Sequence, residues 1–166
     1  ITDGQIFLES DLFFSGQRPA VNVGLSVSRV GGAAQTKAMK KAAGSLRIDL
    51  AQFREMEVFT QFSSDLDDET KASLTYGKGL MELLKQPLCH PLSLSDMVVS
   101  LVAAIGHKFM DVEPKKIKAF QSGLLEFVNA KYPELVATIE KDQVLTDELR
   151  EEILAATDEY KKVNHG

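Results

Sequence analysis

The chain has 166 residues, 44% of them hydrophobic and 26% charged, which is the composition of a globular protein and excludes a disordered or low-complexity one. Its formal net charge of −5 is concentrated in residues 63–166, where eighteen acidic residues face twelve basic ones, and this balance argues against nucleic-acid binding. Because no run of about eighteen apolar residues occurs, we expect any contact with a membrane to be indirect, through partner proteins.

Alternating apolar and polar residues predict strands in the first part of the chain. The alternation runs through residues 6–9 and again through residues 21–28, and between them Ser15-Gly16 and Arg18-Pro19 are typical of a loop. Two strands and a loop do not make a stable unit. We therefore predict the edge of a sheet whose other strands lie outside this sequence. We also expect the chain to be a piece of a longer protein, because it starts in the middle of a fold.

Apolar residues at helical spacing begin at about Ala33. The first stripe predicts one long helix that contains Gly44 at a bend or a close contact. Residues 63–68 interrupt the pattern before a second helix, which ends near Pro87 and Pro91. The two stripes comprise Leu46, Leu50, Phe53, Met56 and Phe59 or Phe62 in the first helix, and Leu74, Leu80, Met81 and Leu84 in the second.

Capping residues and prolines predict the later helices. Ser93 and Asp96 have the pattern of an N-cap with an acidic third position, Pro114 and Pro133 suit a first helical turn, and Thr146 precedes another helix. Their apolar stripes are Met97, Leu101 and Ile105; Ile117, Phe120, Leu124, Phe127 and Val128; Leu135, Val136 and Ile139; and Leu149, Ile153, Ala156 and Tyr160. We predict five or six helices packed as a bundle.

Motifs for a complete active site are absent from the sequence. The chain has no phosphate loop of the form GxxxxGK[ST], and no GxGxxG, GxSxG or HExxH. Cys89 and His90 are adjacent, but His107 and His165 stand at no ligand spacing from them, so we predict no metal site.

One stretch, residues 24–35 (GLSVSRVGGAAQ), is unusual. Arg29 stands at the end of an apolar, strand-like segment and is followed by Gly31, Gly32 and then a helix. Ligand-binding groups favour strand ends because the sheet holds them rigidly, and a guanidinium offers a fixed fork of donors to an anion with several oxygens. The alternative is a structural arginine paired with a carboxylate. From the residues alone, that alternative is the simpler one.

Four stretches carry a family resemblance: ITDGQIFLE, SGQRPAVNVGLSVSRVGGAAQTKAMKK, QFSSDLD and ELLKQP. Together they resemble the alpha subunit of F-type ATP synthases, densely over residues 1–87 and more loosely in the last helices. The resemblance implies a mainly α chain. Residues 1–35 would be the last strands of a truncated RecA-like α/β nucleotide-binding domain, and residues 36–166 a C-terminal helical bundle domain.

The resemblance also implies roles for individual residues. Arg29 matches an arginine finger that acts in trans, on the terminal phosphate in the catalytic site of the neighbouring beta subunit, and Ser26 and Ser28 would support its strand end. Three residues match positions around the adenine of the alpha subunit's own, non-catalytic nucleotide site: Arg18, Pro19 and Gln86. Leu88 stands where the family often has a second glutamine, and Gln17 where an apolar residue is common, which we expect to matter little.

For the whole protein, the resemblance implies a regulatory, non-catalytic subunit in the head of a rotary enzyme that couples transmembrane ion flow to ATP synthesis. The full-length subunit would bind ATP or ADP with Mg²⁺, whereas this chain, without the phosphate loop, is expected neither to bind nucleotide tightly nor to be active alone. The implied partners are beta subunits in an alternating hexamer, the central gamma subunit, and the delta and b subunits of a peripheral stalk. The implied location is the cytoplasmic side of a bacterial plasma membrane, or the equivalent organelle inner membrane.

Two alternatives stay open at this point. The B subunit of V-type ATPases has the same architecture and a serine-arginine strand end, although the continuation VGGAAQ favours the F-type. A stand-alone helical interaction module with no link to nucleotide would need residues 1–30 to fold without their sheet.

Overall fold

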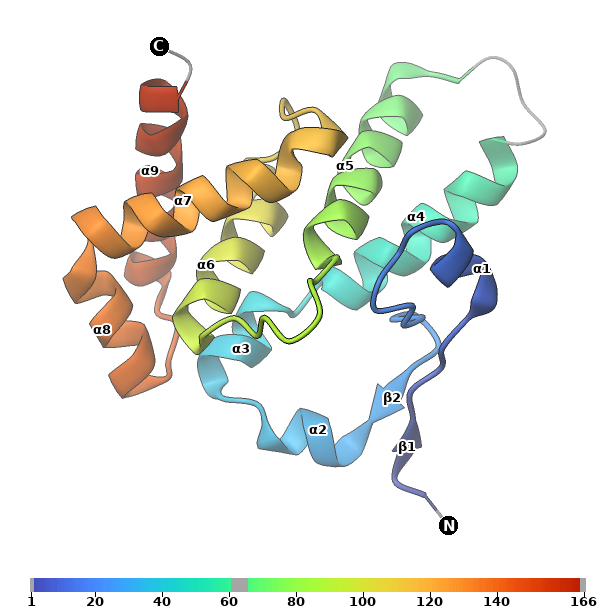
Figure 1. Ribbon diagram of the computed structural model, residues 1–166, viewed down its shortest axis with the longest axis horizontal. Coiled ribbons are helices and arrows are strands. Elements are labelled where there is room, and N and C mark those ends of the chain that lie inside the picture. The colour runs from blue at the N-terminus through green and yellow to red at the C-terminus, as the bar shows by residue number, and fades with distance from the viewer. Residues whose placement is uncertain (1, 61–65, 165–166) are drawn as a thin grey trace.

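The computed structural model describes residues 2–60 and 66–164 and shows a mainly helical bundle with a small sheet near the N-terminus (Figure 1). The predicted mainly α fold is therefore confirmed. The elements are, in chain order, β1 (Gly4–Gln5), α1 (Ser10–Phe14), β2 (Val27–Ser28), α2 (Arg29–Ala34), α3 (Lys37–Ala42), α4 (Leu46–Thr60), α5 (Asp68–Leu84), α6 (Leu94–Ile105), η1 (Pro114–Lys116), α7 (Ile117–Lys131), α8 (Pro133–Asp142) and α9 (Asp147–Asn164). From α3 to α9 the described residues form seven α-helices, where the sequence predicted five or six.

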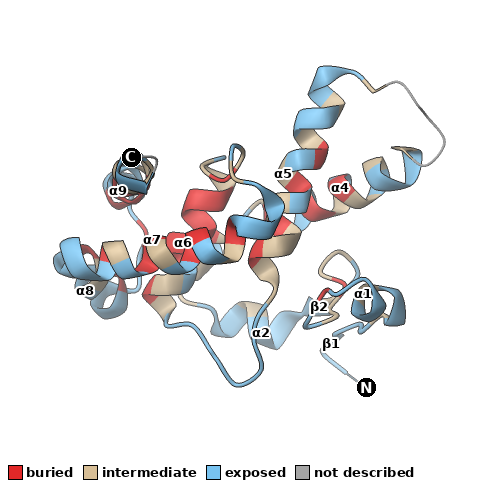
Figure 2. Cartoon of the chain, turned by 45° about the horizontal axis from the view of Figure 1, so that its top comes forward, coloured by how far each residue is buried: buried red, intermediate tan, exposed pale blue. Residues whose placement is uncertain are grey.

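Helix α6 is the centre of the bundle and packs against α3, α5, α7, α8 and α9. In Figure 2 the buried residues concentrate in α6 and in the parts of α5 and α7 beside it. The predicted stripe of α6 is wrong at Met97, which is 37% exposed, while Val98 and Val102 are buried. Because α6 is apolar around most of its circumference, helical spacing could not identify which side faces the core.

The long helix predicted from residue 33 is three helices. Gln35 has an extended backbone that ends α2, and the Thr36 hydroxyl caps α3 by accepting a hydrogen bond from the Met39 N–H at 3.1 Å. Gly44 lies in the turn between α3 and α4 and not inside a helix. Short polar side chains that bond nearby backbone groups mark the boundaries between helices in this way. Apolar spacing alone does not reveal such boundaries.

The apolar stripe of α4 covers only its first half. Leu46, Leu50 and Phe53 are buried, as predicted, but Phe59 is 75% exposed. Phe62, the other residue assigned to this position, and residues 63–65 of the predicted interruption lie outside the described residues. The interruption ends at Asp67, whose carboxylate caps α5 by accepting a hydrogen bond from the Thr70 N–H at 2.6 Å.

Local signals at the later helices are confirmed. The Ser93 hydroxyl accepts a hydrogen bond from the Asp96 N–H at 3.1 Å, and the Thr146 hydroxyl accepts one from the Leu149 N–H at 3.1 Å. Pro114 opens η1, which continues into α7, and Pro133 opens α8. No helix in the described part of the chain is both long enough and apolar enough to cross a lipid bilayer.

The strands predicted for residues 6–9 and 21–28 are confirmed only in part, because an antiparallel bridge joins Leu8 to Val21 and only Val27–Ser28 of the second segment forms a strand, β2. The sheet is one antiparallel pair, β1 with β2, in which Gly4 lies opposite Ser28. Asn22 explains the loss of the second strand: its side-chain oxygen accepts a hydrogen bond from the Leu25 N–H at 3.1 Å, and its carbonyl accepts one from the Ser26 N–H at 3.0 Å. These bonds form a turn in place of an extended strand.

Candidate functional site

Arg29 is the first residue of α2 and directly follows β2. The Ser28 hydroxyl caps this helix by accepting a hydrogen bond from the Gly31 N–H at 2.9 Å. The sequence prediction that Gly31 and Gly32 precede the helix is therefore wrong, because both lie inside α2. The Arg29 side chain is 77% exposed, and its charged partner is the carboxylate of Asp3, at 2.9 Å and 66% exposed. An ion pair this exposed contributes about 0–1 kcal/mol, so the guanidinium can exchange Asp3 for another anion at little cost.

Ser26 and Ser28 hold the backbone around Arg29 and do not bond its guanidinium. The Ser26 hydroxyl accepts a hydrogen bond from the Phe7 N–H at 3.0 Å and donates one to the Asn22 carbonyl. These two bonds connect Phe7 to the turn formed by residues 22–26. Ser28 fixes the first turn of α2, as described above. Only Ser28 bonds a residue of the helix that begins at Arg29, while Ser26 bonds residues earlier in the chain.

The structure brings Arg18 and Gln86 together from distant parts of the chain. The Gln86 N–H donates a hydrogen bond to the Arg18 carbonyl at 2.9 Å, and the Arg18–Pro19 peptide bond is cis. The Arg18 guanidinium stacks over the ring of Phe13 at 4.4 Å from the centroid. The sequence interpretation gave Phe13 no role, and its contact with the Arg18 guanidinium became visible only in the structure. Arg18, Pro19 and Gln86 are all exposed, so a ligand can reach them.

An apolar cavity of about 190 Å³ opens beside Gln86. Lys118 lies at its wall and donates hydrogen bonds to the Leu83 carbonyl at 3.1 Å and to the Gln121 side-chain oxygen at 2.6 Å. Burial lowers the pKa of Lys118. Leu88 is 89% exposed and does not line this cavity.

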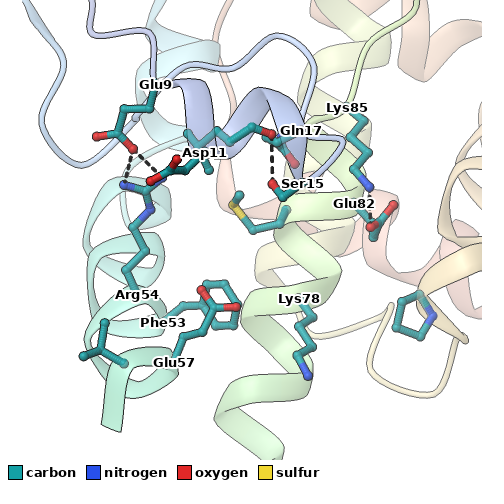
Figure 3. A pocket seen from close by; sticks show the side chains of 14 residues that line it. Glu9, Asp11, Ser15, Gln17, Phe53, Arg54, Glu57, Lys78, Glu82 and Lys85 are labelled. Atoms are coloured by element: carbon teal, nitrogen blue, oxygen red, sulfur yellow. Dashed lines mark hydrogen bonds and ion pairs between the residues drawn. The ribbon is translucent and has the colours of Figure 1, made fainter. Parts of the chain in front are cut away.

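A larger cavity, of about 510 Å³, lies between α1, α4 and α5 (Figure 3). Two ion pairs border it: Arg54 with Glu9 at 3.4 Å, and Lys85 with Glu82. Gln17 also lines it and is only 6% exposed, although the sequence interpretation gave this residue no role. Three elements distant in sequence form this cavity, so no local pattern could have predicted it.

Cys89 is exposed and has a left-handed backbone, with φ of 60°. The described residues contain no group of three His, Cys, Asp or Glu side chains placed to hold a metal ion. His165, one of the histidines considered above, lies outside them.

Comparison with known proteins identifies the family. Residues 35–160 match the family model described as ATP synthase alpha/beta chain, C terminal domain. The chain belongs to this family. It is 52% identical to the ATP synthase subunit alpha of Clostridium acetobutylicum over 163 residues, 98% of this chain and 32% of that protein. With the same coverage it is 52% identical to the ATP synthase subunit alpha, sodium ion specific, of Acetobacterium woodii, and 50% identical to the alpha subunit of Clostridium kluyveri.

The resemblance to alpha subunits predicted from the sequence is therefore confirmed, and the chain spans about a third of the length of these relatives. The match to the C-terminal domain family starts at residue 35, so it includes Gln86 but leaves out Arg18 and Arg29. The alignment to the alpha subunits covers 98% of the chain and so extends over the N-terminal segment as well.

Proposed function

We propose that this chain is the C-terminal part of the alpha subunit of a rotary F-type ATP synthase, which couples ion flow across a membrane to ATP synthesis. Residues 1–35 would complete a RecA-like nucleotide-binding domain, and residues 36–166 would form the helical bundle domain. The identity to alpha subunits supports the first statement, and the start of the family match at residue 35 supports the boundary. The proposal does not specify the coupling ion, although one relative is named as sodium ion specific.

In this proposal the full-length subunit binds ATP or ADP with Mg²⁺ and alternates with beta subunits in a hexamer. The gamma subunit occupies the centre of that hexamer, and the delta and b subunits form a peripheral stalk. The chain then meets the cytoplasmic side of a plasma membrane, or the equivalent organelle membrane, only through these partners.

Arg29 is proposed as the arginine finger for a neighbouring beta subunit. The observation that carries this role is its exposed guanidinium, fixed at its base by the β2–α2 junction and paired only weakly with exposed Asp3. Phosphoryl transfer spreads negative charge over the terminal phosphate, and an arginine placed there is typically worth about 10³–10⁵ in rate. Because the finger would come from another subunit, the rate would depend on the geometry of the interface.

Arg18, Pro19 and Gln86 are proposed to contact the base at the non-catalytic nucleotide site. The hydrogen bond between Gln86 and Arg18 supports this proposal, because it joins the two stretches of chain that carry these residues. With Leu88 in the adjoining loop, recognition on that side rests on shape and stacking.

The experiment is an Arg29→Lys substitution in the complete enzyme. Lysine keeps the charge but loses the planar fork, so we expect turnover to fall by at least about 10²-fold while subunit assembly and nucleotide affinity at the catalytic sites stay close to normal. Arg150→Lys is the matched control, because Arg150 is also an exposed arginine but lies in α9, away from the β2–α2 junction. Near-normal turnover in a fully assembled Arg29→Lys enzyme would remove Arg29 from the mechanism.

The two alternatives are less consistent with these findings. The relatives are named as ATP synthase alpha subunits, which favours that assignment over a V-type B subunit. A stand-alone helical module would bury its large apolar side chains, whereas Phe14 is 82% exposed and Val30 is 63% exposed.

A further inference from the structure

The cavity between α1, α4 and α5 has properties of a ligand site that the proposed function does not use. Its volume of about 510 Å³ lies within the range of small-molecule sites, roughly 300–1,000 Å³. Its apolar lining comes from Leu12, Phe53, Val58, Met81 and Pro114. Such a lining supports the body of a small hydrocarbon-rich molecule.

Gln17 is the buried polar residue of this cavity. Its backbone N–H donates to the Leu12 carbonyl at 2.9 Å, but its side-chain amide makes no hydrogen bond with any described residue. Within the described part of the chain, no fully buried side-chain nitrogen or oxygen lacks a partner, so the Gln17 amide keeps some exposure to solvent, and Gln17 itself lines the cavity. A primary amide offers a donor and an acceptor side by side, and it therefore complements the same pair on a ligand.

The charges around the cavity select against an anion. Four acids and three bases line it, which leaves one negative charge in excess. Arg54 and Lys85 are already paired with Glu9 and Glu82. The third base, Lys78, makes no ion pair with a described residue, but a carboxylate bound beside it would still face the excess of acids around the cavity, whereas a neutral ligand needs no counter-charge.

We propose that this cavity binds a small neutral amphiphile with a carboxamide-like or lactam-like edge. The edge pairs with the Gln17 amide, and a ring or short hydrocarbon body lies on Phe53 and Met81. The proposal is independent of Arg29 and of the nucleotide roles given to Arg18 and Gln86.

Benzamide is the probe for this site, and benzoate is its anionic counterpart of the same shape. Titrated into the ¹⁵N-labelled 166-residue chain, benzamide is expected to shift the side-chain NH₂ signal of Gln17 and the backbone signals of Leu12 and Met81 saturably. We expect a dissociation constant on the order of 1 mM, as for a small fragment, and binding of benzoate at least about fivefold weaker. No saturable shift, or tighter binding of benzoate, would overturn the proposal.

Substitution of Gln17 separates a binding role from a structural one. Gln17→Leu is expected to weaken benzamide binding at least about tenfold, as for the loss of a hydrogen-bonded pair, while the melting temperature stays level, because the side-chain amide makes no hydrogen bond within the described fold. Gln17→Met, which keeps the unbranched shape, should behave in the same way. Gln52→Leu, at an exposed position of α4 outside the cavity, should leave binding unchanged. Undiminished binding in a folded Gln17→Leu or Gln17→Met chain would show that the amide has no such role.

Discussion

Gly77 of α5 lies directly against the ring of Phe53 in α4. A Cβ atom at Gly77 would stand 2.2 Å from the ring atoms Cγ and Cδ2, which is far inside contact distance. Phe53 is 4% exposed, and its own Cβ would lie 2.5 Å from the added atom, so a rotation of the ring alone would not remove the clash. The closeness of α4 and α5 at this point therefore depends on the absence of a side chain at Gly77.

We expect Gly77→Ala to lower the free energy of unfolding by about 1–3 kcal/mol, the usual cost of overpacking a core. Urea unfolding followed by circular dichroism measures the change. Gly79→Ala is the control in the same helix, since its Cβ would lie at an ordinary 3.5 Å from Ile117 Cδ1 and gain up to about 1 kcal/mol of helix propensity. Equal effects of the two substitutions would contradict the packing argument.

Glu140 of α8 makes the stability of the chain depend on pH. Its carboxylate accepts a hydrogen bond from the Ser95 N–H at 2.8 Å, and this bond lowers the pKa of Glu140 below 4.5. A carboxyl whose pKa is lower in the folded state stabilises the fold above its unfolded pKa, and this contribution is lost as the pH falls through the folded value. We therefore expect Glu140→Gln to destabilise the chain at neutral pH and to have a smaller effect below the folded pKa.

Urea unfolding of the original chain and of Glu140→Gln at about pH 7 and about pH 3 tests this expectation. Glu134→Gln is the control, because Glu134 is exposed on the same helix and its carboxylate has no bond to a described residue. A Glu140→Gln effect that is the same at both pH values would show that the hydrogen bond from Ser95 does not act through the carboxylate charge.

Hydrogen exchange should separate the N-terminal segment from the bundle. Leu25 and Val27 are exposed, and few backbone hydrogen bonds hold residues 21–27, whereas Leu124 and Val128 are almost fully buried in α7. We expect amides of residues 21–27 to exchange at least about 100-fold faster than those of residues 117–128. Slower exchange in the N-terminal segment would contradict this, and dimerisation through the exposed edge of the sheet would be its most direct cause.

Features that depend only on residues within one helical turn of each other could be predicted from the sequence. Ser93 and Thr146 cap their helices because the bonded N–H groups lie three residues further on. The turn at Asn22 is equally local, but the apolar alternation of residues 21–28 predicts a strand. That pattern does not take account of the side-chain hydrogen bond that forms the turn. Phe59 shows another limit: its spacing is helical, yet α4 extends past the part of the bundle that could cover it.

The candidate sites depended on more than local pattern. Periodicity does not predict that Arg18 and Gln86 lie close together. In the sequence, only the family resemblance assigns these two residues to one site. The resemblance also gave Arg29 its proposed role, while composition and spacing favoured a structural arginine. Neither periodicity nor the family resemblance predicts the burial of Gln17, because this burial results from the packing of the α1 region against α4 and α5.

Residues 2–28 are fastened to the bundle by polar contacts at three points, beside the packing of Val23 against the core. Arg47 donates to the Gly24 carbonyl at 3.0 Å, Arg54 pairs with Glu9 at 3.4 Å, and Gln86 bonds the Arg18 carbonyl at 2.9 Å. Water can replace such partners at a net cost of about 1 kcal/mol each, far less than separating a packed apolar interface of domain size. We therefore expect this junction to open before the core around α6 does.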